Sequence, residues 1–514
     1  MAVRTVYLDN SATTPVDPRV AAAMARAVVE TFGNASSVHG FGQQARAAVD
    51  RARREVAALI GARQNEIVFT SGGTEANNLA IRGLCEVAAA HGRHIITSAI
   101  EHPSVAGTCL ELEKRGWEVT RLPVYKNGIV RLDDLSEALR PDTVLITIML
   151  ANNEIGTIQP IREIGALVKQ RRAAGNGHLW FHTDAVQAAG RVALNVDELA
   201  CDLLTISAHK IYAPKGTGVL YVRRGVRLQG QNVGGHQERE RRAGTENVPG
   251  IVAFGEAARL AREELAERSA HDRALRDRFE AAVHSRIPDI VMNGDREQRL
   301  GHLSNISFRF IEGEGLLINL DLEGVAVSTG SACSSGTLEP SPVIRALGVD
   351  DELARGSIRF SFGRDNTEPE VDYTIEVLMR AVERLRALSP LTVVSHGELP
   401  EANAIADEKN PVCGDRIRLS LMIADERIEK AGYMAYGCPP TFVCGSALTE
   451  MITGKLIAEA QQLTRADLLN AIGGLPSRKH HAAALAIETL NSALQDYRMK
   501  QDSHVNPGNH VNPV

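Results

Sequence analysis

The sequence predicts an α/β protein, and three observations indicate this class. Amphipathic helical stretches such as DPRVAAAMARAVVETF alternate with short apolar runs across residues 19–388. The runs are rich in Val, Ile and Thr and end in Gly, Asn or polar turns, which is typical of buried strands in a mostly parallel sheet. The length of 514 residues suffices for about three packed units, since domains average about 150 residues.

The apolar runs give the expected strands of the first unit in chain order. They are residues 66–70, 94–98, 143–149 and 203–207. A long charged helical stretch follows over 256–285, and the pattern then changes to NISFRF and SIRFSF. This alternation predicts a second, smaller α+β unit.

The C-terminal part has a composition of its own. Residues 392–411 are polar, carry two prolines and read as a linker. Residues 412–497 form a further unit with a strand-like IRLSLMI, a Gly/Pro/Cys cluster and amphipathic helices. Residues 498–514 repeat HVNP and are expected to be a disordered tail.

Composition excludes several classes of function. The net charge of −6 argues against binding to nucleic acid or to an anionic membrane. The longest apolar run, over 144–151, is too short to span a bilayer, and the N-terminus shows no signal peptide. A cytoplasmic location is therefore expected, and the odd count of seven cysteines fits a reducing compartment.

Residues 67–80 read IVFTSGGTEANNLA, in which a buried strand runs into glycines and then a helix. Free N–H groups at such a helix start form an anion site, and glycine lets the backbone approach the anion. The segment matches neither the P-loop nor the dinucleotide fingerprint. A plain strand-to-helix turn explains the same residues, so the alternative stays open.

A lysine at the end of a strand is the second chemical signal. Lys210 follows the apolar strand 203–207, where desolvation would lower its pKa and make it a nucleophile. A surface lysine at a strand end is the plainer reading. Asp184 with Gln187, and Asn152 with Asn153, also follow strands, where α/β sheets bind ligands. Together with the anion site they indicate pyridoxal phosphate.

At this combination the chain resembles the cysteine desulfurases, enzymes of the class V aminotransferase group. The blocks that carry the resemblance are YLDNSATTPVDPRV, FGNASSVHGFGQQA, IVFTSGGTEANNLAI, HIITSAIEHPSV, NNEIGTIQPI, HTDAVQAAG, SAHKIYAPKGTG, RAGTEN, STGSACSSGTLEPS and SIRFSFGR. It covers about residues 3–391 and implies the fold-type I pyridoxal-phosphate transferase fold. The large parallel-sheet domain would span 16–260, and the small α+β domain 1–15 and 261–391.

The resemblance implies roles for individual residues. Lys210 would form the internal Schiff base with the cofactor, and Asp184 would pair with the pyridinium nitrogen. His102 would stack over the cofactor and move protons, and Arg359 would bind the substrate carboxylate, which the planar guanidinium suits. The residues implied to hold the phosphate are Gly73, Thr74, Ser207, His209 and, from a partner subunit of a homodimer, Thr245. Asn153 and Gln187 are implied to contact the phenolic oxygen of the cofactor ring. Asn153 is also implied to contact the substrate. An ordinary strand arginine and a core histidine are the plainer readings of Arg359 and His102.

Cys333 lies in STGSACSSG, a segment too small and polar to pack in a core. The resemblance implies that L-cysteine replaces Lys210 on the cofactor and that Lys210 removes the α-proton. The Cys333 thiolate then attacks the substrate sulfur, which leaves a persulfide and releases alanine.

The C-terminal unit carries thiols, imidazoles and a carboxylate in three separate segments. These groups are typical ligands of zinc or of an iron-sulfur cluster. It resembles the scaffold proteins on which iron-sulfur clusters are assembled, through CGD, YGC and the TE-x-x-x-GK stretch. It departs from them because His481 stands where a third cysteine belongs. The expected metal ligands are Cys333, Cys413, Asp415, Cys438 and His481, with Cys444 and His480 as lesser candidates.

The leading hypothesis is a desulfurase that passes sulfur to its own scaffold-like domain. One alternative is a related pyridoxal-phosphate lyase or aminotransferase, acting on selenocysteine or cysteine sulfinate, whose C-terminal domain only docks partners or binds zinc. Another is an interaction protein that senses metal and has an inactive front domain. Cys85, Cys109 and Cys201 are expected to be packing residues.

Overall fold

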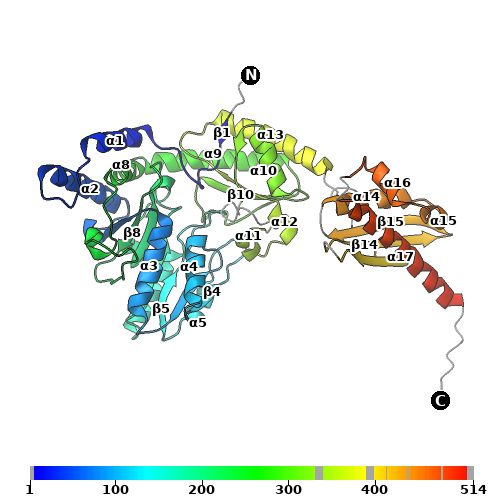
Figure 1. The fold of residues 1–514 in the computed structure, drawn as a ribbon, viewed down its shortest axis with the longest axis horizontal. Coiled ribbons are helices and arrows are strands. Elements are labelled where there is room, and N and C mark those ends of the chain that lie inside the picture. Colours follow the sequence, from blue (N-terminus) through cyan, green and yellow to red (C-terminus); the bar gives the residue numbers. More distant parts are fainter. Residues whose placement is uncertain are drawn as a thin grey trace, which may run out of the picture. The chain divides into compact units, whose positions relative to one another are not determined.

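The computed structural model describes residues 5–329, 340–388, 397, 399–411, 414–436, 439–475 and 479–505. Two compact units are present, residues 1–382 and 383–514 (Figure 1). Within the described ranges, no helix is both long and apolar enough to cross a membrane.

The first unit is built on a seven-stranded sheet with the order β2-β8-β7-β6-β5-β3-β4. Its strands are β2 (Ile67–Thr70), β3 (His94–Ser98), β4 (Glu118–Leu122), β5 (Thr143–Thr147), β6 (Trp180–Asp184), β7 (Leu203–Ser207) and β8 (Gly218–Val222). All neighbours are parallel except β8, which is antiparallel to both β2 and β7. The predicted α/β class is therefore confirmed, and each of the four predicted runs contains a strand.

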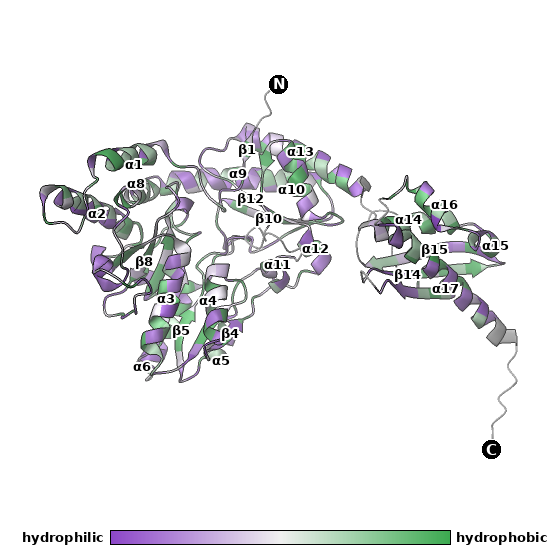
Figure 2. Cartoon of the chain, viewed as in Figure 1, coloured by the Kyte–Doolittle hydropathy of each residue, from purple (hydrophilic) through white to green (hydrophobic). Residues whose placement is uncertain are grey.

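Both faces of this sheet are buried under helices. In β2, Ile67 and Phe69 belong to one apolar core and Val68 belongs to the other, because successive side chains of a strand point to opposite faces. Figure 2 shows strands such as β5 and β8 as hydrophobic and the covering helices as mixed. The helices of this part are α1 (Pro18–Glu30), α2 (Gly40–Leu59), α3 (Gly73–Ala88), α4 (Pro103–Glu113), α5 (Leu132–Ala138), α6 (Ile161–Ala173), α7 (Val196–Leu199) and α8 (Val248–Glu263).

The charged stretch predicted over 256–285 is two helices. The helix α8 ends at Glu263, and α9 (Leu265–Arg286) begins after Glu264, whose φ of −100° and ψ of 9° interrupt the helix. The side chain of Glu264 accepts hydrogen bonds from Arg19 and Arg268, which holds the break in place.

The smaller α+β part of the first unit contains an antiparallel sheet in the order β12-β10-β9, as the change of pattern predicted. A parallel pair, β1 with β11, joins the N-terminus to it. Its elements are β1 (Val6–Tyr7), β9 (Ile290–Met292), β10 (Leu303–Phe308), α10 (Gly313–Leu322), β11 (Val325–Ala326), α11 (Pro342–Ala346), α12 (Asp351–Arg355), β12 (Ser357–Ser361) and α13 (Glu368–Leu388).

The second unit is a three-stranded antiparallel sheet, β13-β14-β15, packed against helices. Its core includes Leu419, Leu421, Tyr433 and Leu448. The elements are β13 (Ala404–Lys409), β14 (Arg416–Ala424), β15 (Arg427–Tyr436), α14 (Pro439–Ile452), α15 (Ile457–Ala460), α16 (Arg465–Ala471) and α17 (His480–Val505).

Two boundaries in this unit correct the sequence analysis. Residues 404–409, predicted as part of the linker over 392–411, form β13, whose small buried Ala404 and Ala406 give little hydrophobic signal. The helix α17 continues to Val505, so residues 498–505 are not part of a disordered tail. Its last turns are stabilised because Lys500 pairs with Asp496 one turn earlier, at 2.6 Å.

Candidate functional site

A cavity of about 260 Å³ lies where several strands of the large sheet end. Lys210 enters it from the short 3-10 turn after β7, Asp184 from the end of β6, and His102 from the residue that caps α4. The lining residues are Ala12, Gly73, Thr74, Asn77, His102, Ser104, Met149, Ala151, Asn153, Asp184, Val186, Gln187, Ser207, His209 and Lys210. Lys210 and eight other residues that were predicted to bind the cofactor or to act in catalysis therefore line one cavity.

The Lys210 amine is held against the N-terminal segment. Its Nζ donates hydrogen bonds to the carbonyl oxygens of Ser11 at 2.5 Å and Ala12 at 2.7 Å. Gln187 donates to the same Ser11 oxygen at 2.9 Å. Two cavity-lining side chains are thereby fixed by the backbone that follows β1.

Asp184 is buried and firmly oriented. One carboxylate oxygen accepts a hydrogen bond from Asn77 Nδ2 at 2.7 Å, and the other accepts from the backbone N–H of Val186 at 2.9 Å. Asn77 also donates to the Ser104 hydroxyl at 2.8 Å. The carboxylate is therefore presented in one orientation toward the cavity.

The N-terminus of α3 and the end of β7 form an anion cradle. Gly73 and Thr74 open the helix, so their backbone N–H groups have no partner in the preceding turn. A Cβ on Gly73 would lie 3.0 Å from Val186 Cγ2, so a side chain there would require Val186 to shift. The buried Ser207 hydroxyl has no hydrogen-bond partner among the described residues. The site thus offers donors for a phosphate group that the protein itself does not satisfy.

His102 is held in one orientation and is uncharged. Its Nδ1 accepts from the Ser104 backbone N–H at 3.1 Å, so the neutral ring carries its proton on Nε2. Burial lowers the pKa of His102; the Lys210 charge lowers it too, whereas Asp184 opposes the change. Burial, with the charges of Lys210 and Lys215, likewise lowers the pKa of His209 to about 4.

Arg359 on β12 is almost fully buried next to the cavity. Its guanidinium pairs with Asp9 at 2.8 Å and donates to the Asn153 carbonyl oxygen at 2.8 Å. The predicted carboxylate-binding arginine and the predicted substrate-contacting asparagine are therefore in direct contact. Asn152 has another task, because its Oδ1 accepts from the N–H groups of Glu154 and Ile155 and closes the turn after β5.

Several residues around the cavity were not found from the sequence. Asn77 and Ser104 line it and orient Asp184 and His102. Glu101, which precedes His102 in the chain, does not line the cavity, and burial raises the pKa of its carboxyl to about 8. The sequence signals for Asn77 are its place one helical turn after Gly73 and its position in the block IVFTSGGTEANNLAI.

Some predicted residues are elsewhere. Thr245 is exposed and does not line the cavity, so its action from a partner subunit stays a prediction. Cys333, Cys413 and Cys438 lie outside the described residues. Cys85, Cys109 and Cys201 are buried thiols, as expected of packing residues, and burial raises the pKa of both Cys109 and Cys201 to about 12.

In the second unit, the two candidate histidines differ. His481 Nε2 lies 3.3 Å from the buried Asp415 carboxylate, which also accepts from the Thr441 hydroxyl at 2.8 Å. His480 instead contacts the Leu475 carbonyl oxygen at 2.9 Å. Cys444 is packed in the apolar core. Among the residues that the structure describes, no group of three metal-binding side chains is present.

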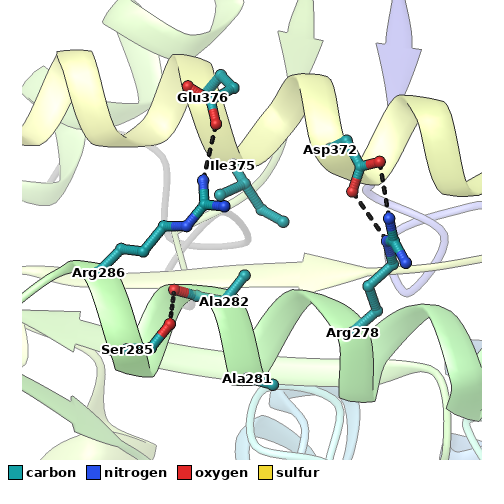
Figure 3. Close-up of a pocket in the computed structure, with 8 residues that line it drawn as sticks. All are labelled: Arg278, Ala281, Ala282, Ser285, Arg286, Asp372, Ile375 and Glu376. Atoms are coloured by element: carbon teal, nitrogen blue, oxygen red, sulfur yellow. Dashed lines mark hydrogen bonds and ion pairs between the residues drawn. The ribbon is translucent and has the colours of Figure 1, made fainter.

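A larger surface groove lies between α9 and α13, with a volume of about 650 Å³ (Figure 3). In Figure 3, Arg278 pairs with Asp372 and Arg286 with Glu376, both at 2.8 Å. These ion pairs connect the two helices, and the groove contains none of the predicted site residues.

Comparison with known proteins identifies the family. Residues 6–374 match the family "Aminotransferase class-V", and residues 394–504 match the "NifU-like N terminal domain". The chain therefore belongs to the class V aminotransferase family, whose cofactor is pyridoxal phosphate, and it carries an added NifU-like domain. Within the family it groups with the cysteine desulfurases.

The relatives support this grouping over the whole first unit. The chain is 51% identical over 387 residues to "Cysteine desulfurase IscS" of Dictyoglomus turgidum, covering 75% of this chain and 97% of that one. It is 52% identical over 385 residues to "Cysteine desulfurase" of a Nostoc species, covering 75% and 94%. A solved "NIFS-LIKE PROTEIN" has a TM-score of 0.70 and 37% identity over 74% of this chain and 100% of that chain. The predicted resemblance and fold class are confirmed.

Proposed function

We propose that the first unit cleaves L-cysteine to alanine and passes the sulfur, by way of Cys333, to the NifU-like domain of the same chain. The observation that carries this proposal is the convergence of three groups on one cavity. These are the Lys210 amine, the oriented Asp184 carboxylate and the anion cradle with its unsatisfied Ser207 hydroxyl. They match the aldehyde, the ring nitrogen and the phosphate of pyridoxal phosphate.

When bound, pyridoxal phosphate withdraws electrons from the α-carbon of the amino acid attached to it. Gly73, Thr74 and Ser207 would bind its phosphate, and Asp184 would keep the ring nitrogen protonated. Lys210 accepts the α-proton at Nζ. His102 holds a proton at Nε2 because its other nitrogen is engaged by Ser104, so it can donate where a proton is needed.

Arg359 positions the substrate through its carboxylate. Two of its donors are already used by Asp9 and by the Asn153 carbonyl oxygen, which fixes the plane of the guanidinium. Each terminal nitrogen retains a second N–H, so a carboxylate can be bound without breaking either contact.

Cys333 is the proposed sulfur acceptor. Its thiolate attacks the sulfur of the substrate, so an S–S bond forms and the carbon–sulfur bond of the substrate breaks. The electron pair of the broken bond stays on the substrate carbon, which takes up a proton to give alanine. Cys333 is left as a persulfide.

We place the receiving site in the NifU-like domain, at Cys413, Asp415, Cys438 and His481. The contact of His481 with Asp415 supports this histidine over His480 as the fourth group. Imidazole and thiolate together can ligate the iron of a cluster. Iron and sulfide are here the cargo of assembly.

A homodimer completes the proposal. Val28, Val29, Phe32, Val38 and Phe41 are exposed by 54–89% around the α1–α2 connection, and the rings of Phe32 and Phe41 lie 5.2 Å apart. An exposed apolar patch of this kind is typical of an interface. A second copy covering it, and bringing its own Thr245 to the cavity, would supply the predicted phosphate contact. The reduced buried thiols are consistent with a cytoplasmic location.

The test is the Cys333→Ser variant of the full chain. We expect no sulfide release from L-cysteine, while the absorbance of the bound cofactor is unchanged. Cys109→Ala is the control, because that thiol is buried with a raised pKa and does not line the cavity. Sulfide release that survives in Cys333→Ser contradicts the proposal.

A further inference from the structure

Tyr212 has a backbone conformation that bulky residues avoid. It follows Lys210 by two positions, is 3% exposed, and has a φ of +68°. A left-handed conformation brings Cβ close to the following carbonyl, so it persists in a non-glycine residue only where the surroundings enforce it.

The surroundings are three arginines gathered around the ring. The guanidinium carbons of Arg364, Arg268 and Arg191 lie 4.9, 5.1 and 5.5 Å from the ring centroid. The Tyr212 hydroxyl accepts from the Arg364 backbone N–H at 3.0 Å and from Arg191 Nη2 at 3.4 Å. Arg364 and Arg268 pair with the Asp17 carboxylate and Arg191 pairs with that of Asp272, so each of the three guanidinium groups lies beside a carboxylate. We call these three arginines the arginine cage.

Tyr212 also forms hydrogen bonds with the N-terminal segment that accepts the hydrogen bonds of the Lys210 amine. The Tyr212 N–H donates to Thr14 Oγ1 at 2.8 Å, and the Tyr212 carbonyl oxygen accepts from the Asp17 N–H at 3.0 Å. Residues 11–17, the N-terminal strap, therefore contact Tyr212 at one end. At the other end, the carbonyl groups of Ser11 and Ala12 accept the hydrogen bonds of the Lys210 amine.

We propose that Tyr212 is a positioning residue for Lys210: the arginine cage fixes its left-handed turn, and this turn sets the register of the strap against the amine. The inference rests on the proposed role of Lys210. It assigns to Tyr212 the placement of the amine and not a contact with cofactor or substrate, since Tyr212 does not line the cavity.

The test compares Tyr212→Phe with the wild-type chain, both loaded with pyridoxal phosphate. The variant removes the acceptor of one buried donor, Arg191, and one partly buried donor, the Arg364 N–H, so the turn and the strap loosen and water reaches the amine. We expect the pH midpoint of the lysine-bound cofactor absorbance to rise by about half a unit or more. We also expect cofactor dissociation about tenfold faster than in the wild type.

Tyr221→Phe is the matched control. Tyr221 is also a buried tyrosine, with the Arg223 guanidinium 5.9 Å from its ring, but it lies on β8 away from the cavity. It is expected to keep the wild-type midpoint and dissociation rate, even where its melting temperature falls. A Tyr212→Phe protein with both wild-type values overturns the inference.

Two further variants keep the test decisive. Where Tyr212→Phe fails to fold, Arg364→Gln replaces it, since Arg364 is the most exposed member of the arginine cage at 17% against 6% for the others. Arg364→Gln must also raise the pH midpoint, and an unchanged midpoint overturns the inference.

Lys210→Ala separates this inference from the proposed function. If it keeps the wild-type titration, the proposed role of Lys210 is wrong. If it abolishes the titration while Tyr212→Phe matches wild type, only the inference fails.

Discussion

The two candidate sites of this chain are built in different ways. The cofactor cavity of the first unit stands on strand ends and helix starts, and its side chains are held by buried hydrogen bonds such as Asn77 to Asp184. In the second unit, the described part of the site is a small cluster of Asp415, Thr441 and His481 beside α14 and α17. A rigid site suits chemistry that needs fixed geometry. A site on which an iron-sulfur cluster is assembled must instead be able to bind and release its metal.

The largest effect should follow from removing the amine at the centre of the rigid site. We expect Lys210→Ala to lower alanine formation by about 10³-fold or more, because the α-proton then has no acceptor at that position. Alanine is measured by amino acid analysis. Lys215→Ala is the control, because Lys215 lies in the same loop but does not line the cavity, and a similar loss there would contradict the assignment.

The second prediction compares His481 with His480 as candidate metal ligands in the NifU-like domain. We expect His481→Ala to weaken iron binding by about 10- to 100-fold, as loss of a ligand or its orienting partner does. His480→Ala should leave it unchanged, because His480 contacts a backbone carbonyl instead. Iron and acid-labile sulfide are measured after anaerobic reconstitution. Equal losses in both variants would contradict the assignment of His481.

Ser207→Ala removes a single donor from the anion cradle. A hydrogen bond to a charged group contributes about 1.5–3 kcal/mol, so cofactor affinity should fall by about tenfold or more. Fluorescence titration of the cofactor-free protein measures this dissociation constant. Ser98→Ala is a control, because its hydroxyl donates to Glu101 and neither residue lines the cavity. Unchanged affinity in Ser207→Ala would argue against the phosphate cradle.

The last prediction concerns stability and not activity, at the buried Glu101, whose pKa is raised to about 8 from the ordinary 4.5. Because the folded state keeps this proton and the unfolded state releases it, stability falls as pH rises from 4.5 to 8, by about 1.4 kcal/mol per pH unit at most. Glu101→Gln removes this dependence. Its melting temperature should exceed that of the wild type by more at pH 8 than at pH 5.5, and a constant difference would contradict the burial of an acid here.

The fold was predictable where local patterns are strong and less so where they are weak. The strands β3 and β7 are continuous buried runs, so their sequences indicate them directly. The strand β4 exposes Glu118 and Arg121, and β13 buries only small alanines, so neither was predicted.

The residues of the cofactor site were likewise predictable only where they stand in a strong local pattern. Lys210, Asp184 and Gly73 were found because each stands beside a strand and within a family block. Asn77 was missed because its partner Asp184 is 107 residues away in the chain, and only the folded sheet brings them together. The arginine cage around Tyr212 likewise combines four distant segments and has no local signature.

The central claim is that the first unit delivers sulfur to the second. The most direct measurement follows radioactive sulfur from labelled L-cysteine through the full chain under anaerobic conditions, with ferrous iron and then a reductant, which supplies the two electrons that convert persulfide sulfur to sulfide. We predict label as a persulfide on Cys333 before the reductant is added and as protein-bound acid-labile sulfide after it, and in a Cys413→Ser, Cys438→Ser double variant the same persulfide but no protein-bound acid-labile sulfide. Acid-labile sulfide that forms equally well in the double variant would contradict the account.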